Sequence, residues 1–323
     1  KKIKFHPKRW EKTYFEWLKN VRDWNISRQI WWGHQLPVWF HEPKCVPKKG
    51  HESEIVKCKE FIVSSKEPKC EFCNAKFVQS SDVLDTWFSS ALWPFATLGW
   101  PQKTNDLKNF YPTSALSTAR DIINLWVSRM IFSGLEFTGK VPFSDVIIHG
   151  TIITKEGKRM SKSLGTGVDP LELIERCGAD ALRFGLIWQA MGNQDIRWSE
   201  EHVLAGKKFC NKIWNASRFV LQNANSNLKS KISNLKLKTQ NLTAADKKIL
   251  NELAKTIREV NEKIEKYEFG QALHKLYDFF WHEYADIYIE TAKKQLRRSE
   301  EVGAPKPTRE VSSPTGTSAA KAS

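Results

Sequence analysis

The sequence predicts an α/β domain with a parallel sheet, followed by an all-α helical bundle. Between residues 82 and 198, short runs typical of strands alternate with longer runs of helical periodicity, which favours a parallel sheet covered by helices. After Ser199 the strand-like runs stop, and helical patterns occupy residues 201–223, 244–266 and 270–296. With 323 residues, 41% of them hydrophobic, the chain is long enough for two domains with separate cores.

Two segments precede the alternating region. In residues 1–36, Trp10, Tyr14 and Trp17 recur at helical spacing, and we interpret them as the packed side of an amphipathic helix. Residues 37–80 are rich in Pro, Lys and Cys and predict an insertion with short extended pieces. We therefore expect a connecting segment over residues 1–36 and an insertion over residues 37–80.

Two elements of residues 81–198 have clear patterns. Residues 114–137 predict one long helix, because Ile122, Trp126 and Met130 share an apolar side. Residues 146–148 (VII) predict a buried strand that ends at the turn formed by His149 and Gly150. The helix and the strand are the pair of elements that an α/β layer requires.

The rest of the chain divides into a bundle over residues 199–298 and a tail over residues 299–323. In the bundle we interpret Trp214 and Phe219 as core residues, and expect Lys212 and Arg218 to track phosphate groups. The tail consists largely of Pro, Ser, Thr, Gly, Ala and Lys. Such a composition buries too little apolar surface to order the chain, so the tail is predicted to be disordered.

The charge balance is strongly basic, with 51 Lys and Arg against 36 Asp and Glu and a net charge of +15. An excess of this size suggests a polyanionic partner such as RNA, or the phosphates of ATP. The alternative explanation of the positive charge is a general drift of the composition toward lysine, because Lys is spread along the whole chain. No apolar run reaches the roughly 20 residues that span a bilayer, and no signal peptide opens the sequence, which predicts a cytoplasmic protein without a membrane partner.

Four of the six cysteines lie close together in the insertion. The four are Cys45, Cys58, Cys70 and Cys73. The last two form a CxxC knuckle, and the first two would complete a tetrahedral four-thiolate zinc site. Cys45 and Cys58 lie 13 positions apart, which is unlike a second CxxC, and His41 or His51 is an alternative ligand. The cysteines therefore predict either a structural zinc ion in a zinc-ribbon-like insertion or reduced thiols in a degenerate ribbon.

Residues 157–165 (GKRMSKSLG) combine cations and hydroxyls in a loop flanked by glycines. Fixed positive charge, small hydrogen-bond donors and glycine hinges are what a mobile clamp on phosphate groups requires. For the pentapeptide at residues 159–163 taken alone, a solvated basic loop would be the default interpretation. The neighbouring motifs decide between these interpretations.

Three stretches together resemble the valine-specific class I aminoacyl-tRNA synthetases. Residues 159–163 (RMSKS) are similar to the KMSKS signature of that class, with Arg159 in place of the first lysine. Residues 23–34 (DWNISRQIWWGH) and 82–94 (DVLDTWFSSALWP) resemble two further motifs of the valine-specific enzymes, whereas the isoleucine-specific ones differ in the second. The resemblance covers about residues 1–296. It implies the second half of a Rossmann-type catalytic domain with a zinc-ribbon-like insertion, followed by part of a helical anticodon-binding bundle.

The resemblance implies ATP-dependent activation of valine to valyl-adenylate and its transfer to tRNA(Val), with Mg²⁺ accompanying ATP. The implied valine pocket consists of Trp87, Ile122 and Trp126. The implied ATP-binding residues are Asp121, His149, Gly150, Ile152 and Lys162. The implied catalytic residues are Lys162, Arg159, Ser161 and Ser163. The chain departs from the family at Ala119, where a glycine usually precedes the acidic residue, which puts a close backbone approach to the nucleotide in question.

Several parts of such an enzyme are not found in this sequence. The His-Ile-Gly-His signature, the first half of the nucleotide-binding sheet, the editing domain and a C-terminal coiled coil have no counterpart. The chain is therefore expected to need an N-terminal half for activity and to be inactive alone. Two alternatives stay open: a non-enzymatic fragment that binds tRNA or another RNA, and one chain of a split synthetase.

Overall fold

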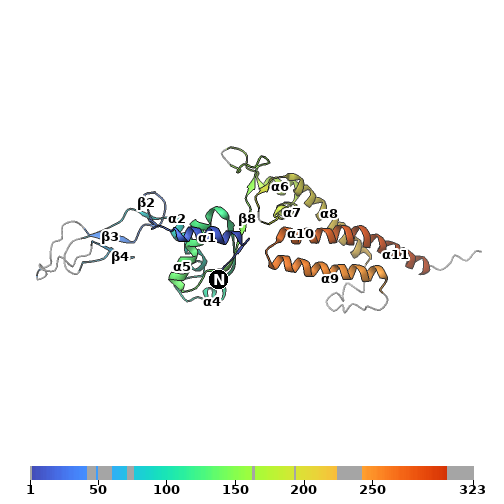
Figure 1. The fold of residues 1–323 in the computed structure, drawn as a ribbon, viewed down its shortest axis with the longest axis horizontal. Coiled ribbons are helices and arrows are strands. Elements are labelled where there is room, and N and C mark those ends of the chain that lie inside the picture. The colour runs from blue at the N-terminus through green and yellow to red at the C-terminus, as the bar shows by residue number, and fades with distance from the viewer. Residues whose placement is uncertain are drawn as a thin grey trace, which may run out of the picture. The chain divides into compact units, whose positions relative to one another are not determined.

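The computed structural model describes residues 2–41, 49, 60–70, 76–161, 164–192, 194–223 and 242–303 (Figure 1). The chain divides into two compact units, Lys1–Gly167 with Ala190–Trp198, and Val168–Gln189 with Ser199–Ser323. Helices α6 (Pro170–Cys177) and α7 (Ala179–Gln189) thus group with the second unit, although the expected division after residue 198 places them in the first. The roles expected of each domain stay predictions.

The first unit contains a three-stranded parallel sheet in the order β1–β8–β7. Strand β8 (Phe143–His149) lies in the centre, between β1 (Lys4–His6) and β7 (Thr113–Ala119). Val146 of β8 pairs with Phe5 on one side and with Leu116 on the other. The predicted parallel sheet and its buried strand are confirmed, because Val146 is fully buried and strands covered on both faces are apolar throughout.

The long helix predicted over residues 114–137 is wrong in its first half. Residues 114–119 belong to strand β7, and a single 3₁₀ turn (Arg120–Ile122) and a π-helix (Ile123–Val127) follow before the regular helix α5 (Ser128–Thr138) begins. The apolar periodicity that suggested a helix starts only at residue 122. Pairing with β8 decides the conformation of the residues before it, and that pairing is not visible in local periodicity.

The core of the first unit lies between the sheet and the helices α1 (Arg9–Lys19) and α5. The predicted amphipathic helix is confirmed as α1, whose Tyr14 ring lies 5.3 Å from the ring of Phe5 in β1. Met130 and Val127 are completely buried in the same core. The sheet is therefore packed against helices from two separate parts of the unit's sequence.

Short elements complete the first unit. Strand β3 (Val38–His41) forms the centre of an antiparallel sheet with β4 (Phe61–Val63) and β5 (Phe77–Gln79), which confirms extended pieces in the insertion. The remaining elements are β2 (Ser27–Arg28) paired with β6 (Val83–Leu84), α2 (Thr86–Ala91), α3 (Trp93–Ala96), α4 (Asn105–Phe110), and β9 (Ile152–Ile153) paired with β10 (Ile196–Arg197).

The second unit is all helical, as the sequence predicts (Figure 1). Besides α6 and α7 it contains α8 (Glu200–Asn223), α9 (Ala244–Glu265), α10 (Phe269–Asp278), a π-helix (Phe279–Tyr288) and α11 (Ile289–Gly303). An aromatic cluster joins these helices, since the Tyr277 ring lies 5.0 Å from both Trp188 and Phe209. Helix α11 continues past the expected start of the tail at residue 299, and residues 304–323 lie outside the described part. Within the part that the structure describes, no helix combines the length and apolar character of a membrane span.

Candidate functional site

The carboxyl ends of β7 and β8 bring three of the implied ATP-binding residues to one edge of the sheet. Ala119, the last residue of β7, pairs with His149, the last residue of β8. Asp121 lies just beyond β7 in the 3₁₀ turn, with 52% of its side chain exposed, and Gly150 lies just beyond β8. Open α/β sheets bind ligands outside the carboxyl ends of their strands, so this edge is the expected place for a nucleotide.

Gly150 is required by a contact within the chain itself. A Cβ atom at Gly150 would lie 2.0 Å from the backbone oxygen of Gln194, far inside van der Waals contact. The family resemblance implies only an ATP-binding role for this glycine. The segment at residues 194–195 therefore passes directly beneath the turn that follows β8.

Asp195 braces the same turn. Its Oδ1 accepts a hydrogen bond from the Thr151 backbone N–H at 3.2 Å, and its Oδ2 accepts one from Arg120 Nη2 at 3.0 Å. One carboxylate thus connects the turn after β8 with the turn after β7. Sequence reasoning missed Asp195, because its partners lie 44 and 75 residues away and no local pattern marks them.

The loop after β9 carries the residues that resemble the KMSKS signature. Arg159 forms an isolated antiparallel bridge with Ile153, and its Nη1 lies 3.8 Å from Oδ2 of Asp121. The Ser161 N–H donates to Thr166 Oγ1 at 2.9 Å, which closes this part of the loop. Lys162 and Ser163 lie outside the described residues. The structure thus places Arg159 beside Asp121, while Ile152, in β9, is half-buried.

The residues of the implied valine pocket lie on neighbouring elements. Trp87 occupies the first turn of α2, and Trp126 lies in the π-helix. The Trp126 Nε1–H donates to the Ser90 carbonyl of α2 at 3.0 Å, so the two elements are in direct contact. Ile122 ends the 3₁₀ turn before the π-helix. The expectation that Ile122 and Trp126 share one regular α-helix is therefore wrong, although both are half-buried.

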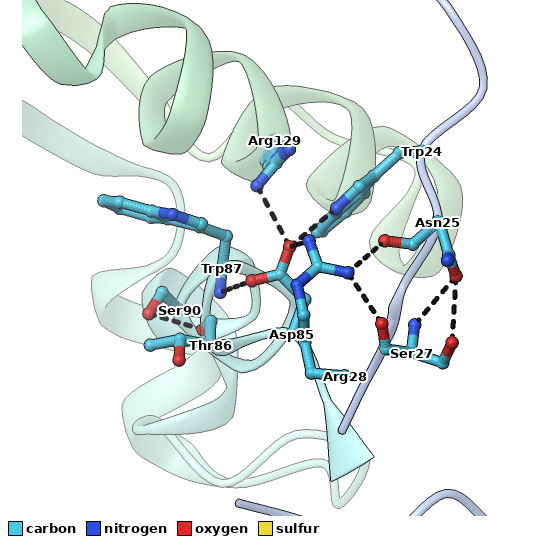
Figure 2. A network of polar contacts seen from close by, with 9 residues as sticks. All are labelled: Trp24, Asn25, Ser27, Arg28, Asp85, Thr86, Trp87, Ser90 and Arg129. Carbon is cyan, nitrogen blue, oxygen red and sulfur yellow. Dashed lines mark hydrogen bonds and ion pairs between the residues drawn. The ribbon is translucent and has the colours of Figure 1, made fainter. Parts of the chain in front are cut away.

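Asp85, immediately before α2, is the centre of a polar network (Figure 2). Its carboxylate is 4% exposed and accepts hydrogen bonds from the Trp87 backbone N–H at 3.0 Å, Trp24 Nε1 at 2.8 Å and Arg28 Nη2 at 2.6 Å. Arg129 Nη1 lies 3.8 Å from the same carboxylate, and the Arg129 guanidinium lies 3.6 Å from the centre of the Trp24 ring. The network joins three segments that are distant in sequence.

The network keeps Asp85 ionised. Burial by itself would raise the pKa of this carboxyl, but the hydrogen bonds from Trp87 and Trp24 and the charges of Arg28 and Arg129 more than offset it, so the pKa lies below its ordinary value. Sequence reasoning missed Asp85. An Asp directly before a short helix is a recognisable N-cap signal, but nothing local indicates its other partners.

The cysteine-rich region is only partly described. Cys70 is buried, whereas Cys45, Cys58 and Cys73 lie outside the described residues. Among the residues that the structure describes, no group of three or more possible metal ligands is found. The four-thiolate zinc site thus stays a prediction, and the ring of the alternative ligand His41 lies edge-on to Phe77 at 5.0 Å.

In the second unit, the basic residues of α8 are partly engaged with the bundle itself. Lys212 forms an ion pair with Asp286 and lies 4.4 Å above the Trp281 ring. The prediction that Trp214 lies in the core is wrong, because this residue is 71% exposed. Phe219 is half-buried beneath Lys293, whose Nζ lies 5.5 Å from the ring. Helix α8 therefore exposes the Trp214 indole to solvent, while Lys212 is held against the bundle.

Comparison with known proteins assigns both parts of the chain. Residues 1–199 match the model of the class I tRNA synthetases (I, L, M and V), and residues 246–314 match the anticodon-binding domain of tRNA ligases. The chain is 51% identical over 301 residues to a valine–tRNA ligase of Clostridium tetani and 50% identical over 302 residues to that of Clostridium acetobutylicum. Each match covers 93% of this chain but only 32% of the relative, so the chain spans about a third of their length.

Solved structures agree on the fold. A LeuRS–tRNA–LeuAMS ternary complex from Agrobacterium radiobacter K84 superposes with a TM-score of 0.62, covering 88% of this chain and 40% of that one at 18% identity. The Mycobacterium tuberculosis methionyl-tRNA synthetase bound to methionyl-adenylate gives a TM-score of 0.64, covering 91% of this chain and 50% of that one, also at 18% identity. With a family model over residues 1–199 and a matching fold, the chain belongs to the class I tRNA synthetases.

Proposed function

We propose that this chain is part of a valine–tRNA ligase, which activates valine with ATP and transfers it to tRNA(Val). The observation that carries the proposal is the edge of the parallel sheet, where Asp121, the turn at Gly150 and the basic loop at Arg159 converge. The choice of valine is supported by relatives named valine–tRNA ligase at 51% and 50% identity. Because the chain spans 32% of those relatives, the remaining parts of the site lie elsewhere in the enzyme.

In the proposed reaction, a carboxylate oxygen of valine attacks the α-phosphorus of ATP. The bond from that phosphorus to the bridging oxygen breaks, and pyrophosphate leaves with its Mg²⁺. A ribose hydroxyl of the tRNA terminus then attacks the carbonyl carbon of valyl-adenylate, loses its proton and displaces AMP. Both steps depend on orientation and on stabilisation of charge rather than on covalent chemistry by the protein.

Each residue at the sheet edge has a role in this proposal. Asp121 accepts hydrogen bonds from the ribose hydroxyls of ATP, and the backbone from His149 to Ile152 contacts adenine. Lys162 stabilises the charge that develops on pyrophosphate, and Arg159 assists, with Ser161 and Ser163 as additional donors. The 3.8 Å pair between Arg159 and Asp121 would open when the nucleotide binds, because both side chains are well exposed and such pairs contribute little.

For the amino acid, we propose a pocket formed by Trp87, Ile122 and Trp126. Two indoles and a β-branched side chain make a rigid apolar slot of a kind that suits an isopropyl group. The hydrogen bond from Trp126 to Ser90 supports this pocket, because it holds the element that carries Trp126 against the helix that carries Trp87.

The proposal is tested by valine-dependent ATP–pyrophosphate exchange, measured in the polypeptide encoded by the whole reading frame that contains this chain, hereafter the complete gene product. Replacing Lys162 with alanine is expected to lower kcat/KM for exchange by about 100-fold while leaving tRNA(Val) affinity within about twofold. Lys155→Ala, in the same loop and exposed, is the matched control and should leave both unchanged.

Other outcomes would favour a different function. Equal loss of exchange and of tRNA binding in Lys162→Ala would contradict the phosphate-clamp role. Salt-dependent tRNA binding by a wild-type protein that shows no amino-acid-dependent exchange would identify an RNA-binding protein without ligase activity.

A further inference from the structure

Helix α2 carries Trp87 and is too short to hold its own position. It has 6 residues, Thr86–Ala91, so it contains few internal hydrogen bonds. A helix of this length is marginal by itself, and its orientation depends on contacts at its two ends. The location of Trp87 is therefore decided by residues outside the helix.

The N-terminal end of α2 is held by Asp85. One carboxylate oxygen accepts from the Trp87 backbone N–H, and the other accepts from Trp24 Nε1 and Arg28 Nη2. Arg129 of α5 adds its charge at 3.8 Å. Figure 2 shows the Trp87 indole directed away from this carboxylate while its backbone nitrogen points toward it. The network thus holds the backbone of Trp87 and leaves its ring available for another contact.

The C-terminal end of α2 is held by the π-helix. The Ser90 carbonyl accepts the hydrogen bond from Trp126 Nε1 at 3.0 Å, and the Trp93 ring just beyond α2 lies 5.8 Å from the Trp126 ring. With both ends tied, the separation between Trp87 and Trp126 is determined by the geometry of α2. A change at Asp85 would therefore alter the separation between Trp87 and Trp126.

Capping a helix does not require the negative charge of Asp85. Asparagine or serine caps a helix as well as aspartate does. Arg129 Nη1 is buried and makes no hydrogen bond within the described residues, so its charge depends on Asp85 for compensation. An uncharged residue at position 85 would leave two guanidinium groups facing each other, which would push the segment containing Arg28 away from α5.

We propose that Asp85 is a positioning residue that sets amino-acid selectivity by fixing Trp87 relative to Trp126, with Arg28 and Trp24 as its partners. The inference rests on the proposed function, because it takes Trp87 and Trp126 as walls of the amino-acid pocket. It goes beyond that function by assigning selectivity to a carboxylate that does not itself contact the amino acid.

The test is Asp85→Asn in the complete gene product, with ATP–pyrophosphate exchange measured for valine and isoleucine. Asparagine keeps the size of the side chain and its capping oxygen but removes the charge. The expected result is a KM for valine raised about tenfold, a preference for valine over isoleucine lowered by a similar factor, and a KM for ATP within about twofold of wild type.

The matched control is Asp145→Asn. Asp145 is also a partly buried carboxylate of the first unit, and it is hydrogen-bonded at 2.8 Å to His6, on strand β1. A general loss of stability would lower the Tm of both variants and change neither KM selectively. A merely structural Asp85 would behave in the same way as Asp145, and that result would overturn the positioning role.

Two further variants keep the inference testable if Asp85→Asn does not fold. Trp24→Phe removes the Nε1 donor together with one ring of the indole but retains an aromatic ring beneath Arg129, and Arg28→Lys retains the charge but not the planar fork. Both are expected to raise the KM for valine by about threefold without changing the KM for ATP. Unchanged valine KM in both variants would overturn the inference. Wild-type protein without valine-dependent exchange would instead overturn the proposed function itself.

Discussion

Replacing Gly150 with alanine places a methyl carbon against the backbone of Gln194. The added carbon would lie 2.0 Å from the Gln194 oxygen and 2.8 Å from its carbonyl carbon. Both atoms belong to the main chain, so no side-chain rotation can relieve the overlap. Either the turn after β8 or the segment at residues 194–195 must move.

The cost of this movement follows from two contributions. Inserting a methyl group into a filled space costs about 1–3 kcal/mol. Moving residues 194–195 also lengthens the hydrogen bonds that Asp195 accepts from Thr151 and Arg120, and hydrogen bonds to a charged group contribute about 1.5–3 kcal/mol each. The Arg120 side chain is 42% exposed, so its bond is discounted. We therefore expect Gly150→Ala to lower the free energy of unfolding by about 3 kcal/mol.

Urea unfolding of the chain, followed by tryptophan fluorescence, measures this change. Gly167→Ala is the matched control, because a Cβ there meets no atom within 4 Å, and its free energy of unfolding should change by less than about 0.5 kcal/mol. If Gly150→Ala were as stable as Gly167→Ala, the close approach of Gln194 would not exist in solution and the bracing role of Asp195 would be wrong.

Three further predictions concern the core of the first unit, the carboxyl of Asp85 and the hydroxyl of Tyr288. Met130→Ala should destabilise the first unit by about 3 kcal/mol in urea unfolding, because the side chain is completely buried, whereas Leu125→Ala, at a position 39% exposed, should cost less than half as much. Folding lowers the pKa of Asp85, so its stabilisation should be complete above its ordinary value of 3.8 and be lost as the pH falls through the lower folded value. Asp85→Asn should therefore flatten the acid limb of the urea midpoint measured between pH 5 and 2, and an unchanged limb would contradict the network. Burial and the 3.0 Å hydrogen bond to Asp246 raise the pKa of Tyr288 to about 12, so its stabilisation should be present below pH 10 and be lost as the pH rises toward 12. Tyr288→Phe should remove this dependence, which ultraviolet titration of tyrosine and alkaline urea midpoints would detect.

Local sequence patterns were sufficient to predict an element where its conformation depends on its own residues. The amphipathic spacing around Tyr14 predicts α1, and the run at residues 146–148 predicts the central strand β8. The long helical patterns after Ser199 predict the bundle, although not its π-helix at Phe279–Tyr288. In each case burial follows the periodicity of the residues themselves.

Elements that depend on distant partners were not predictable in this way. Strand β7 carries small and polar residues, and only its pairing with β8 makes it a strand. Gly150 is recognisable as a special position, but Gln194, the residue that requires it, is far along the chain. Asp85 can likewise be recognised from the sequence as a helix cap. Its ion pair with Arg28 cannot, because the two residues lie 57 positions apart. The motifs that resemble the family could therefore be recognised in the sequence, whereas the contacts that support them could not.

The π-helix at Ile123–Val127 makes this region sensitive to chain length rather than only to side-chain identity. A π-helix contains one residue more than the α-helical turn that would replace it, and Ser128 Oγ donates at 3.1 Å to the Ile123 carbonyl within it. Deleting a single residue here would restore α-helical winding and rotate everything before it by about 100° relative to α5. Asp121 and Ile122 would then turn away from the sheet edge while α5 stayed in place. Over evolutionary time, homologues should therefore show few insertions or deletions between residues 123 and 127.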